Sequence, residues 1–199
     1  MVSIHSARRT VSIRPRRDAD LPGLGVALVE QQVASGYQHR DPLPVPPEQF
    51  IQRPAEEAAW VAELGGEVVG HVAVGRAATG GSGGDAPFVE AWSAASGRPA
   101  EDLRVVGVLF TATSARGTGA GVALLRHATG YVLDAGCVPC LDVLPTHGRA
   151  LSLYRHLGWR EVTRQRPEWL DAGAPDVIGM VFDPRDGYGS ASAPPMHRG

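Results

Sequence analysis

The chain has 199 residues, with 19 Lys and Arg against 21 Asp and Glu and a formal net charge of −2. A length of this order favours a single domain around one core. Because the charges nearly cancel, no overall field would attract nucleic acid, an anionic membrane or a polyanionic substrate. We therefore expect no nucleic-acid or membrane partner, and any recognition of an anion must be local.

No apolar run approaches the roughly 20 residues that cross a bilayer. The opening "MVSIHSARRTVSIRPRR" also lacks an apolar segment followed by a small-residue cleavage site, so we expect a soluble cytoplasmic protein. Cys137 and Cys140 form "CVPC", a spacing that also occurs in redox and zinc sites. The pair follows a predicted helix end and has no second ligand pair, so we interpret both as small apolar core residues and predict no metal site.

The N-terminal third predicts a mixture of strands and helices, after flexible residues 1–10. A short edge strand is expected at 11–14, followed by a helix that Asp18 or Asp20 caps and that runs through Val33. The proline-rich "DPLPVPPEQFIQRP" permits only a short helix near 48–52. Two β-rich runs then flank Gly65-Gly66, a dipeptide suited to a tight hairpin.

A segment rich in Gly, Ser and Ala follows at 77–100. Such a composition buries little apolar surface, so we predict a mobile surface insertion, in which "FVEAW" is the part able to dock back.

The C-terminal half alternates strands and helices. Strands are predicted at "LRVVGVLFTAT" and "VPCLDVL", and the helix between them, ended by Gly136, makes the two strands parallel. A further helix in "HGRALSLYRHLGW" precedes an antiparallel pair, "REVTR" and "DVIGMVF". The tail, 184–199, is predicted to be disordered.

The most informative stretch is "SARGTGAGVALL", residues 114–125, where a predicted strand passes into a helix. A helix N-terminus leaves backbone N–H groups unpaired and carries partial positive charge, so it attracts phosphate oxygens. Glycines at 117, 119 and 121 remove the Cβ atoms that would keep a bulky polyanion away from those amides. The stretch therefore predicts a diphosphate site, to which Arg116 adds a charge.

Two common phosphate loops fit this stretch poorly. A Walker loop needs Lys and then Ser or Thr after its last glycine, where this chain has Val122 and Ala123. A dinucleotide fingerprint is GxGxxG, whereas the spacing here is GxGxG. Nucleotide hydrolysis and hydride transfer are accordingly disfavoured.

"RGTGAG" resembles the [Q/R]xxGx[G/A] signature of the GCN5-related N-acetyltransferases, the GNAT family. A second stretch, "LDVLPTHGRALSLYRHLGW", is similar to the family's later pattern L-x-V-x-x-x-N-x-x-A-x-x-L-Y-x-x-x-G-F. The resemblance implies one domain over 11–183 with an α/β (α+β) fold. That fold is a mixed, mostly antiparallel sheet of about six to seven strands, with a splayed parallel pair formed by the strands near 103–113 and 138–144, and flanking helices.

The resemblance implies acetyl coenzyme A as co-substrate. Its pantetheine arm is like a β-strand and is expected to lie between the splayed strands, while its diphosphate lies on the amides of 117–122. His147, where the family usually has Asn, is expected to donate a hydrogen bond to it. The cofactor-binding residues predicted in this way are Leu109, Phe110, Thr111, Arg116, Gly117, Thr118, Gly119, Ala120, Gly121, Val122, His147 and Ala150.

The resemblance also assigns chemical roles. In the family a Tyr on the helix after the fifth strand commonly protonates the departing thiolate, and Tyr154 occupies that position. Oxyanion support is expected from a backbone N–H near Phe110 or Thr111. Some relatives carry a Glu on the fourth strand as base, but "LRVVGVLF" has no carboxylate. The alternatives for the base are Glu90, Asp142, His71 and a water chain, with solvent as the default.

The acceptor pocket implied by the resemblance is lined by the first helices and the loop between the last two strands. Candidate contacts are Tyr37, His39, Trp92, Trp169 and Asp171. A small amine, an antibiotic, an amino acid and a protein amino terminus all remain open as acceptors, as does a homodimer. Two rivals remain to an N-acetyltransferase: a catalytically silent relative that binds acyl coenzyme A as a sensor or partner module, and a redox or metal protein centred on "CVPC".

Overall fold

The computed structural model describes residues 10–35, 43, 45–77, 86–182 and 184. Its centre is a seven-stranded sheet in the order β1-β2-β3-β4-β5-β7-β6, in which only β4 and β5 are parallel neighbours. This confirms the mixed, mostly antiparallel sheet. The strands are β1 (Val11–Pro15), β2 (Glu56–Leu64), β3 (Glu67–Arg76), β4 (Leu103–Thr111), β5 (Val138–Val143), β6 (Trp159–Gln165) and β7 (Val177–Phe182).

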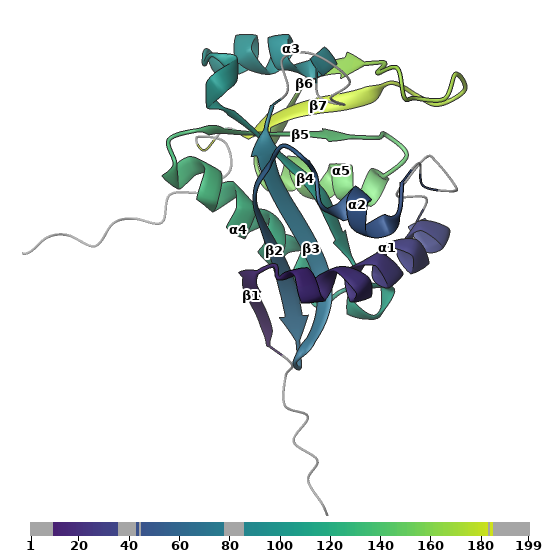
Figure 1. Cartoon of the computed structure of the whole chain (residues 1–199). Helices are drawn as coiled ribbons and strands as arrows, with labels where there is room; N and C mark the ends of the chain where they lie inside the picture. Colours follow the sequence, from purple (N-terminus) through teal and green to yellow (C-terminus); the bar gives the residue numbers. More distant parts are fainter. Residues whose placement is uncertain (1–9, 36–42, 44, 78–85, 183, 185–199) are drawn as a thin grey trace, which may run out of the picture.

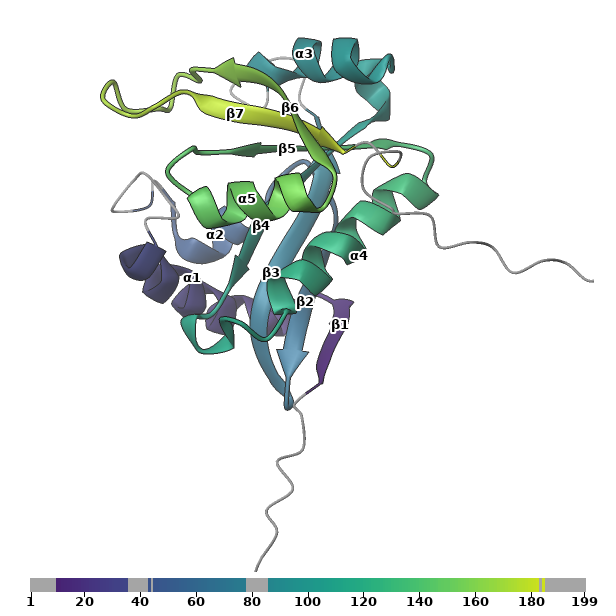
Figure 2. The same ribbon diagram turned by 180° about the vertical axis from the view of Figure 1, so that it is seen from behind.

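Helices cover both faces of the sheet. The α-helices are α1 (Leu21–Ser35), α2 (Pro47–Ile51), α3 (Ala86–Ser96), α4 (Ala120–Asp134) and α5 (Gly148–His156), and short 3-10 turns are η1 (Asp18–Asp20), η2 (Ala100–Asp102) and η3 (Thr113–Ala115). Figure 2 shows α4 and α5 together on one face, with α1 and α2 behind the sheet. This division matches the core, because Leu124 and Leu151 belong to one cluster and Leu28 to another, on the opposite side of the strands.

The predicted hairpin turn in the N-terminal third is confirmed. Gly65 and Gly66 form the β2–β3 turn, with φ values of 65° and 89°. Residues with a Cβ rarely adopt such positive φ values, so the turn favours glycine. Asp20 accepts a hydrogen bond from the backbone N–H of Arg17 at 2.7 Å, and Arg14 holds the same carboxylate at 2.7 Å. Asp20 therefore closes the 3-10 turn η1, whose N-cap is Arg17, and ties β1 to the residues before α1; among the described residues, α1 donates no hydrogen bond to the side chain of the predicted acidic cap.

The parallel pair β4–β5 separates along its length. The pairing runs only from Leu103 opposite Val138 to Val105 opposite Cys140, although β4 continues to Thr111 and β5 to Val143. Beyond this point β5 pairs with β7. Figure 1 shows the result, since β5, β6 and β7 run across the direction of β2, β3 and β4. The predicted splay is therefore present.

The prediction of a mobile insertion at 77–100 is wrong for residues 86–96, whereas the expectation that "FVEAW" within it docks back onto the fold is confirmed. They form α3, which packs on β6 and β7, with Phe88 and Trp92 fully buried. The fit requires Gly179 on β7, where a Cβ would lie 2.8 Å from the Phe88 ring and 3.2 Å from Trp92 Nε1. The composition misled because these aromatic side chains bury far more surface than the surrounding Gly, Ser and Ala suggest.

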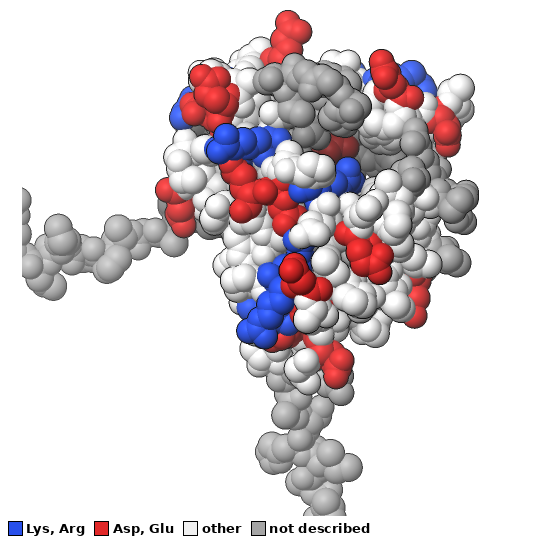
Figure 3. All heavy atoms as spheres, viewed as in Figure 1, with Lys and Arg blue, Asp and Glu red and all other residues white. Residues whose placement is uncertain are grey.

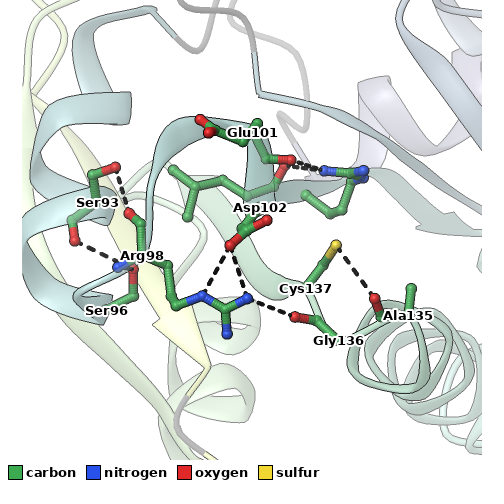
Figure 4. Close-up of polar contacts among 10 residues, drawn as sticks. Ser93, Ser96, Arg98, Glu101, Asp102, Ala135, Gly136 and Cys137 are labelled. Carbon is green, nitrogen blue, oxygen red and sulfur yellow. Dashed lines mark hydrogen bonds and ion pairs between the residues drawn. The ribbon is translucent and has the colours of Figure 1, made fainter.

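Polar contacts tie the end of this segment to the rest of the fold (Figure 4). Arg98 binds Asp102 at 2.8 Å and donates to the carbonyl of Gly136, beyond α4, at 3.0 Å. Ser93 in α3 donates to the carbonyl of Arg98 at 2.7 Å. The segment thereby links α3 to the β4–β5 end of the sheet.

The remaining expectations about the ends of the chain lie outside the described residues, because 1–9, 183 and 185–199 are not described. Within the ranges that are described, every helix is too short or too polar to cross a bilayer. Cys140 is buried in β5, and Cys137 is partly buried in the turn after α4, in keeping with core packing.

Candidate active site

The glycine stretch lies where β4 passes through η3 into α4. Gly117 and Gly119 have φ values of 78° and 87°, and a Cβ at either would meet no atom within 4 Å. The loop is therefore open on its outer side, and its conformation suits glycine alone. Gly121 lies against the end of β4, since a Cβ there would be 3.6 Å from the Thr111 methyl group. The loop and the end of the strand are thus neighbours.

The amides of this loop are only partly used by the protein. Thr118 donates its N–H to the carbonyl of Ala115 at 3.3 Å, and its hydroxyl accepts from the Ala120 N–H at 3.4 Å. The N–H groups of Gly117, Gly119 and Gly121 have no hydrogen-bond acceptor in the part of the chain that the structure describes. Three donors at a helix N-terminus are therefore available to an anion.

Arg116 supplies the positive charge beside these donors. Its side chain is exposed and forms no ion pair with any described residue. Some other arginines are neutralised, such as Arg14, which contacts both Asp20 and Glu63, whereas Arg126 and Arg149 resemble Arg116 in having no ion pair with a described residue. Figure 3 shows acidic and basic side chains intermixed on the α1 face in the same way. The unpaired guanidinium is consistent with local rather than global recognition of an anion.

One edge of β4 is open beside the loop. From Val106 onward this strand has no β5 partner, while its other edge pairs with β3, for instance Phe110 opposite His71 and Thr111 opposite Gly70. Leu109 contacts the core cluster that α4 and α5 cover, and Phe110 is buried in the cluster under α1 and α2. The backbone between them faces the gap that β5 leaves, where an extended, amide-bearing ligand can pair with it.

Tyr154 lies on α5, on the same face of the sheet as Leu109. Its ring contacts the core cluster and lies 6.2 Å from that of Trp159. Burial, with a smaller contribution from the Asp142 charge, raises the pKa of the phenol well above its usual value. Its hydroxyl has no protein hydrogen-bond partner among the described residues. The side chain therefore holds its proton at neutral pH.

His147 and Ala150 belong to the same helix. His147 is the N-cap of α5 and is half-buried, and its carbonyl accepts from the N–H of Leu151 at 3.0 Å. Ala150 contacts the same core cluster as Tyr154. Ala150 and Tyr154 on α5 and Leu109 on β4 thus contact the same core cluster, on one face of the sheet.

Comparison with known proteins decides the family. The profile of the acetyltransferase (GNAT) family matches residues 26–159, which span β2 to β5 and α5. The chain belongs to the GNAT acetyltransferase family. It is therefore an acyltransferase whose co-substrate is acetyl coenzyme A. No curated protein sequence matches the chain significantly.

Solved structures show that this acetyltransferase has the GNAT fold. The ribosomal-protein-S18-alanine N-acetyltransferase of Escherichia coli is 18% identical, with a TM-score of 0.59 over 92% of this chain and 99% of that one. A putative acetyltransferase from Salmonella typhimurium, solved with its cofactor acetyl-CoA, is 15% identical, with a TM-score of 0.63 over 92% and 99%. A spermidine N-acetyltransferase chimera that includes Vibrio cholerae sequence is 18% identical, with a TM-score of 0.59 over 86% and 94%.

The three candidate bases of this acetyltransferase have different surroundings. Glu90 on α3 and Asp142 on β5 are exposed. His71 is fully buried, and both of its ring nitrogens are engaged, Nδ1 with the carbonyl of Val108 at 2.9 Å and Nε2 with Arg16 at 3.2 Å. Burial lowers the pKa of His71 to about 4, with the nearby Arg16 charge acting in the same direction. His71 therefore presents neither an exposed surface nor a free ring nitrogen to an amine.

Of the candidate acceptor contacts, the structure describes Trp92, Trp169 and Asp171. Tyr37 and His39 lie outside the described residues. Trp92 is fully buried under α3, so the prediction that it folds over the site as a substrate contact is wrong. Trp169 is half-buried against the α3 cluster, and Asp171 is exposed in the β6–β7 loop.

Sequence reasoning missed two features of the site. Val108 in β4 has a φ of 50°, the only positive φ outside glycine in the described ranges. His71 was considered only as a base, whereas it contacts the backbone of that residue. A buried polar residue in the otherwise apolar run "VVGHVAVG" was the available signal, because such a residue needs a partner.

Proposed function

We propose that this acetyltransferase moves the acetyl group of acetyl coenzyme A directly onto the amine of a small molecule or peptide. The observation that carries the proposal is the open edge of β4, which ends at a helix N-terminus with three available amide donors. An extended pantetheine arm fits the edge and a diphosphate fits the donors.

The cofactor contacts follow from this placement. The backbone of Leu109, Phe110 and Thr111 would pair with pantetheine, and the amides of Gly117, Gly119 and Gly121 would bind the diphosphate, with Arg116 as counter-charge. Thr118 contributes by organising the loop, because its hydroxyl already donates to the carbonyl of Ala115 at 2.7 Å. His147 and Ala150 would contact the arm from α5.

In the proposed reaction the neutral amine attacks the thioester carbonyl carbon, the C–S bond breaks, and the amine proton passes to water. A backbone N–H of β4 near Phe110 stabilises the oxyanion. Tyr154 donates its proton to the departing sulfur, so that coenzyme A leaves as the thiol, and the phenolate then takes a proton back from solvent. Burial raises the pKa of the Tyr154 phenol. The same surroundings would also raise the pKa of the coenzyme A thiol, so the gap between the two pKa values stays smaller than if only the phenol were buried.

Direct attack is favoured over an acyl-enzyme because neither cysteine is placed to accept the acetyl group. Cys140 is buried in β5. Cys137 precedes Val138, which pairs with Leu103 at the start of β4, whereas the proposed thioester position lies near the other end of that strand, beside 109–111. At about 3.3 Å per residue these positions are roughly 20 Å apart along the strand.

An amine panel with thiol-release detection tests the proposal and the acceptor together. We expect release of coenzyme A with at least one class among small amines, polyamines, aminoglycosides, amino acids and peptides with a free amino terminus. Acetyl coenzyme A should also raise the melting temperature, since a ligand that binds only the folded state stabilises it. No thermal shift at saturating acetyl coenzyme A would contradict the proposal.

A catalytically silent sensor is the second candidate, favoured by the lack of a carboxylate in β4 after Asp102. It predicts a thermal shift with acetyl coenzyme A but no thiol release with any amine. Tyr154 supports the enzyme, because it keeps an available phenol proton on the same face of the sheet as Leu109.

A further inference from the structure

The strand that forms the candidate cofactor edge contains a strained residue. Val108 has a φ of 50°, in the left-handed region that a β-branched side chain avoids. The register of β3 and β4 changes at the same place, because His71 lies opposite Phe110 but Ala73 lies opposite Gly107. Val108 and Leu109 therefore form a bulge, two residues opposite one, just beyond the point where β4 leaves β5.

Such a conformation persists only when its surroundings hold it. The contact that does so is on β3: His71 Nδ1 lies 2.9 Å from the carbonyl oxygen of Val108. Since a carbonyl only accepts, Nδ1 must carry the proton and donate it. The His71 ring also stacks at a tilt on Phe110, with centroids 5.7 Å apart. One side chain thus contacts Val108 in the bulge and Phe110, the residue that follows the bulge.

The other ring nitrogen of His71 is held as well. With the proton on Nδ1, Nε2 is an acceptor, and Arg16 Nη1 lies 3.2 Å away. Arg16 pairs with Glu56 through two contacts, of 2.6 and 2.9 Å, and the side chains of this pair are only 6% and 13% exposed. Glu56, Arg16 and His71 form a buried chain that fixes the ring orientation and the tautomer.

We propose that His71 is a positioning residue that holds the Val108 bulge, and through it the β4 backbone that faces the thioester. This inference rests on the proposed function, because it assigns His71 a role in the same reaction. Without the Nδ1 donor, the partly buried carbonyl of Val108 would lose its partner and the strained residue would relax toward regular β geometry. The amides of Leu109 and Phe110 would then point differently.

A double-mutant cycle between His71→Leu and Val108→Gly tests the proposal. Glycine adopts a φ of 50° without strain, so the bulge in Val108→Gly no longer depends on the histidine. We expect His71→Leu to lower kcat/KM for the best amine of the panel at least tenfold in the wild-type background, and less than threefold in Val108→Gly. An equal fall in both backgrounds would overturn the proposal. His127→Leu is the matched control, because this exposed histidine on α4 only contacts the edge of Trp60.

Conservative variants keep the test decisive if His71→Leu fails to fold. His71→Asn places a donor near the Nδ1 position, whereas His71→Gln places it near Nε2. We expect Asn to retain most of the activity and Gln to lose it, and the reverse order would contradict the proposal.

Amide hydrogen exchange gives a readout that needs no turnover. Exchange in 107–111 should rise in His71→Gln and stay near wild type in His71→Asn, whether or not an acceptor has been found. If wild type releases no thiol but exchange behaves as expected, the proposed function fails and the positioning role stands. If wild type is active and exchange in 107–111 is unchanged in His71→Gln, the positioning role fails.

Discussion

At the scale of single residues, Tyr154 carries the chemical step that is most readily separated from binding. Burial and the Asp142 charge raise the pKa of its phenol, which therefore keeps its proton. The hydroxyl has no protein hydrogen-bond partner in the described ranges, so it can donate to a sulfur. Tyr154→Phe keeps the ring and removes only this donor. We predict that kcat falls about a hundredfold, within the range of general acid catalysis, while the Kd for acetyl coenzyme A changes less than twofold. Equal turnover of the two proteins would remove the proposed role.

His71 predicts a pH dependence of stability. Its pKa falls from 6.5 to about 4 on folding, mainly through burial. As the pH falls, His71 is protonated in the unfolded chain before it is protonated in the folded protein. Its contribution to the free energy of unfolding is therefore fully present above pH 6.5 and is lost as the pH falls toward 4. A shift of this size corresponds to roughly 3 kcal/mol. Urea unfolding at pH 7.5 and 4.5 should show the loss in wild type, and a loss of the same size in His71→Asn would contradict the assignment.

At the scale of elements, the loop between β4 and α4 depends on glycine at a defined position. Gly119 has a φ of 87° and Gly130, inside α4, has an ordinary helical conformation, while a Cβ at either would meet no atom within 4 Å. Gly119→Ala therefore adds strain without a clash, of about 1–2 kcal/mol. We predict roughly tenfold weaker binding of acetyl coenzyme A by titration calorimetry. Gly130→Ala, which removes only a flexible residue, should bind as wild type does; equal affinities of all three proteins would show that the loop conformation is unimportant.

The same elements show how far the sequence predicts the fold. The periodicity of apolar residues and the positions of glycines indicate every strand of the sheet. The glycines at 65, 66, 136 and 158 all have the positive φ that ends a strand or helix. The docking of "FVEAW" was expected but the helix α3 was not, because its order depends on Phe88 and Trp92 fitting against Gly179, about ninety residues away in the chain. The Val108 bulge was missed for a related reason: its partner, His71, lies on another strand.

At the scale of the whole molecule, α3 completes the core on the face opposite α5. Trp92 is fully buried there, whereas Trp169 of the β6–β7 loop is only half-buried at the margin of the same cluster. We predict that Trp92→Ala lowers the free energy of unfolding by about 3–5 kcal/mol, as expected for a large side chain removed from a core. Trp169→Ala should cost clearly less in the same urea titration. Equal losses would mean that α3 is not part of the core.

The central claim is that the open edge of β4 and the start of α4 bind acetyl coenzyme A as one continuous site. A crystal structure with coenzyme A tests it most directly. We predict diphosphate oxygens within hydrogen-bonding distance of the amides of Gly117, Gly119 and Gly121, and pantetheine paired with β4 between Leu109 and Thr111. A diphosphate bound elsewhere, with these three amides unused, would contradict the account.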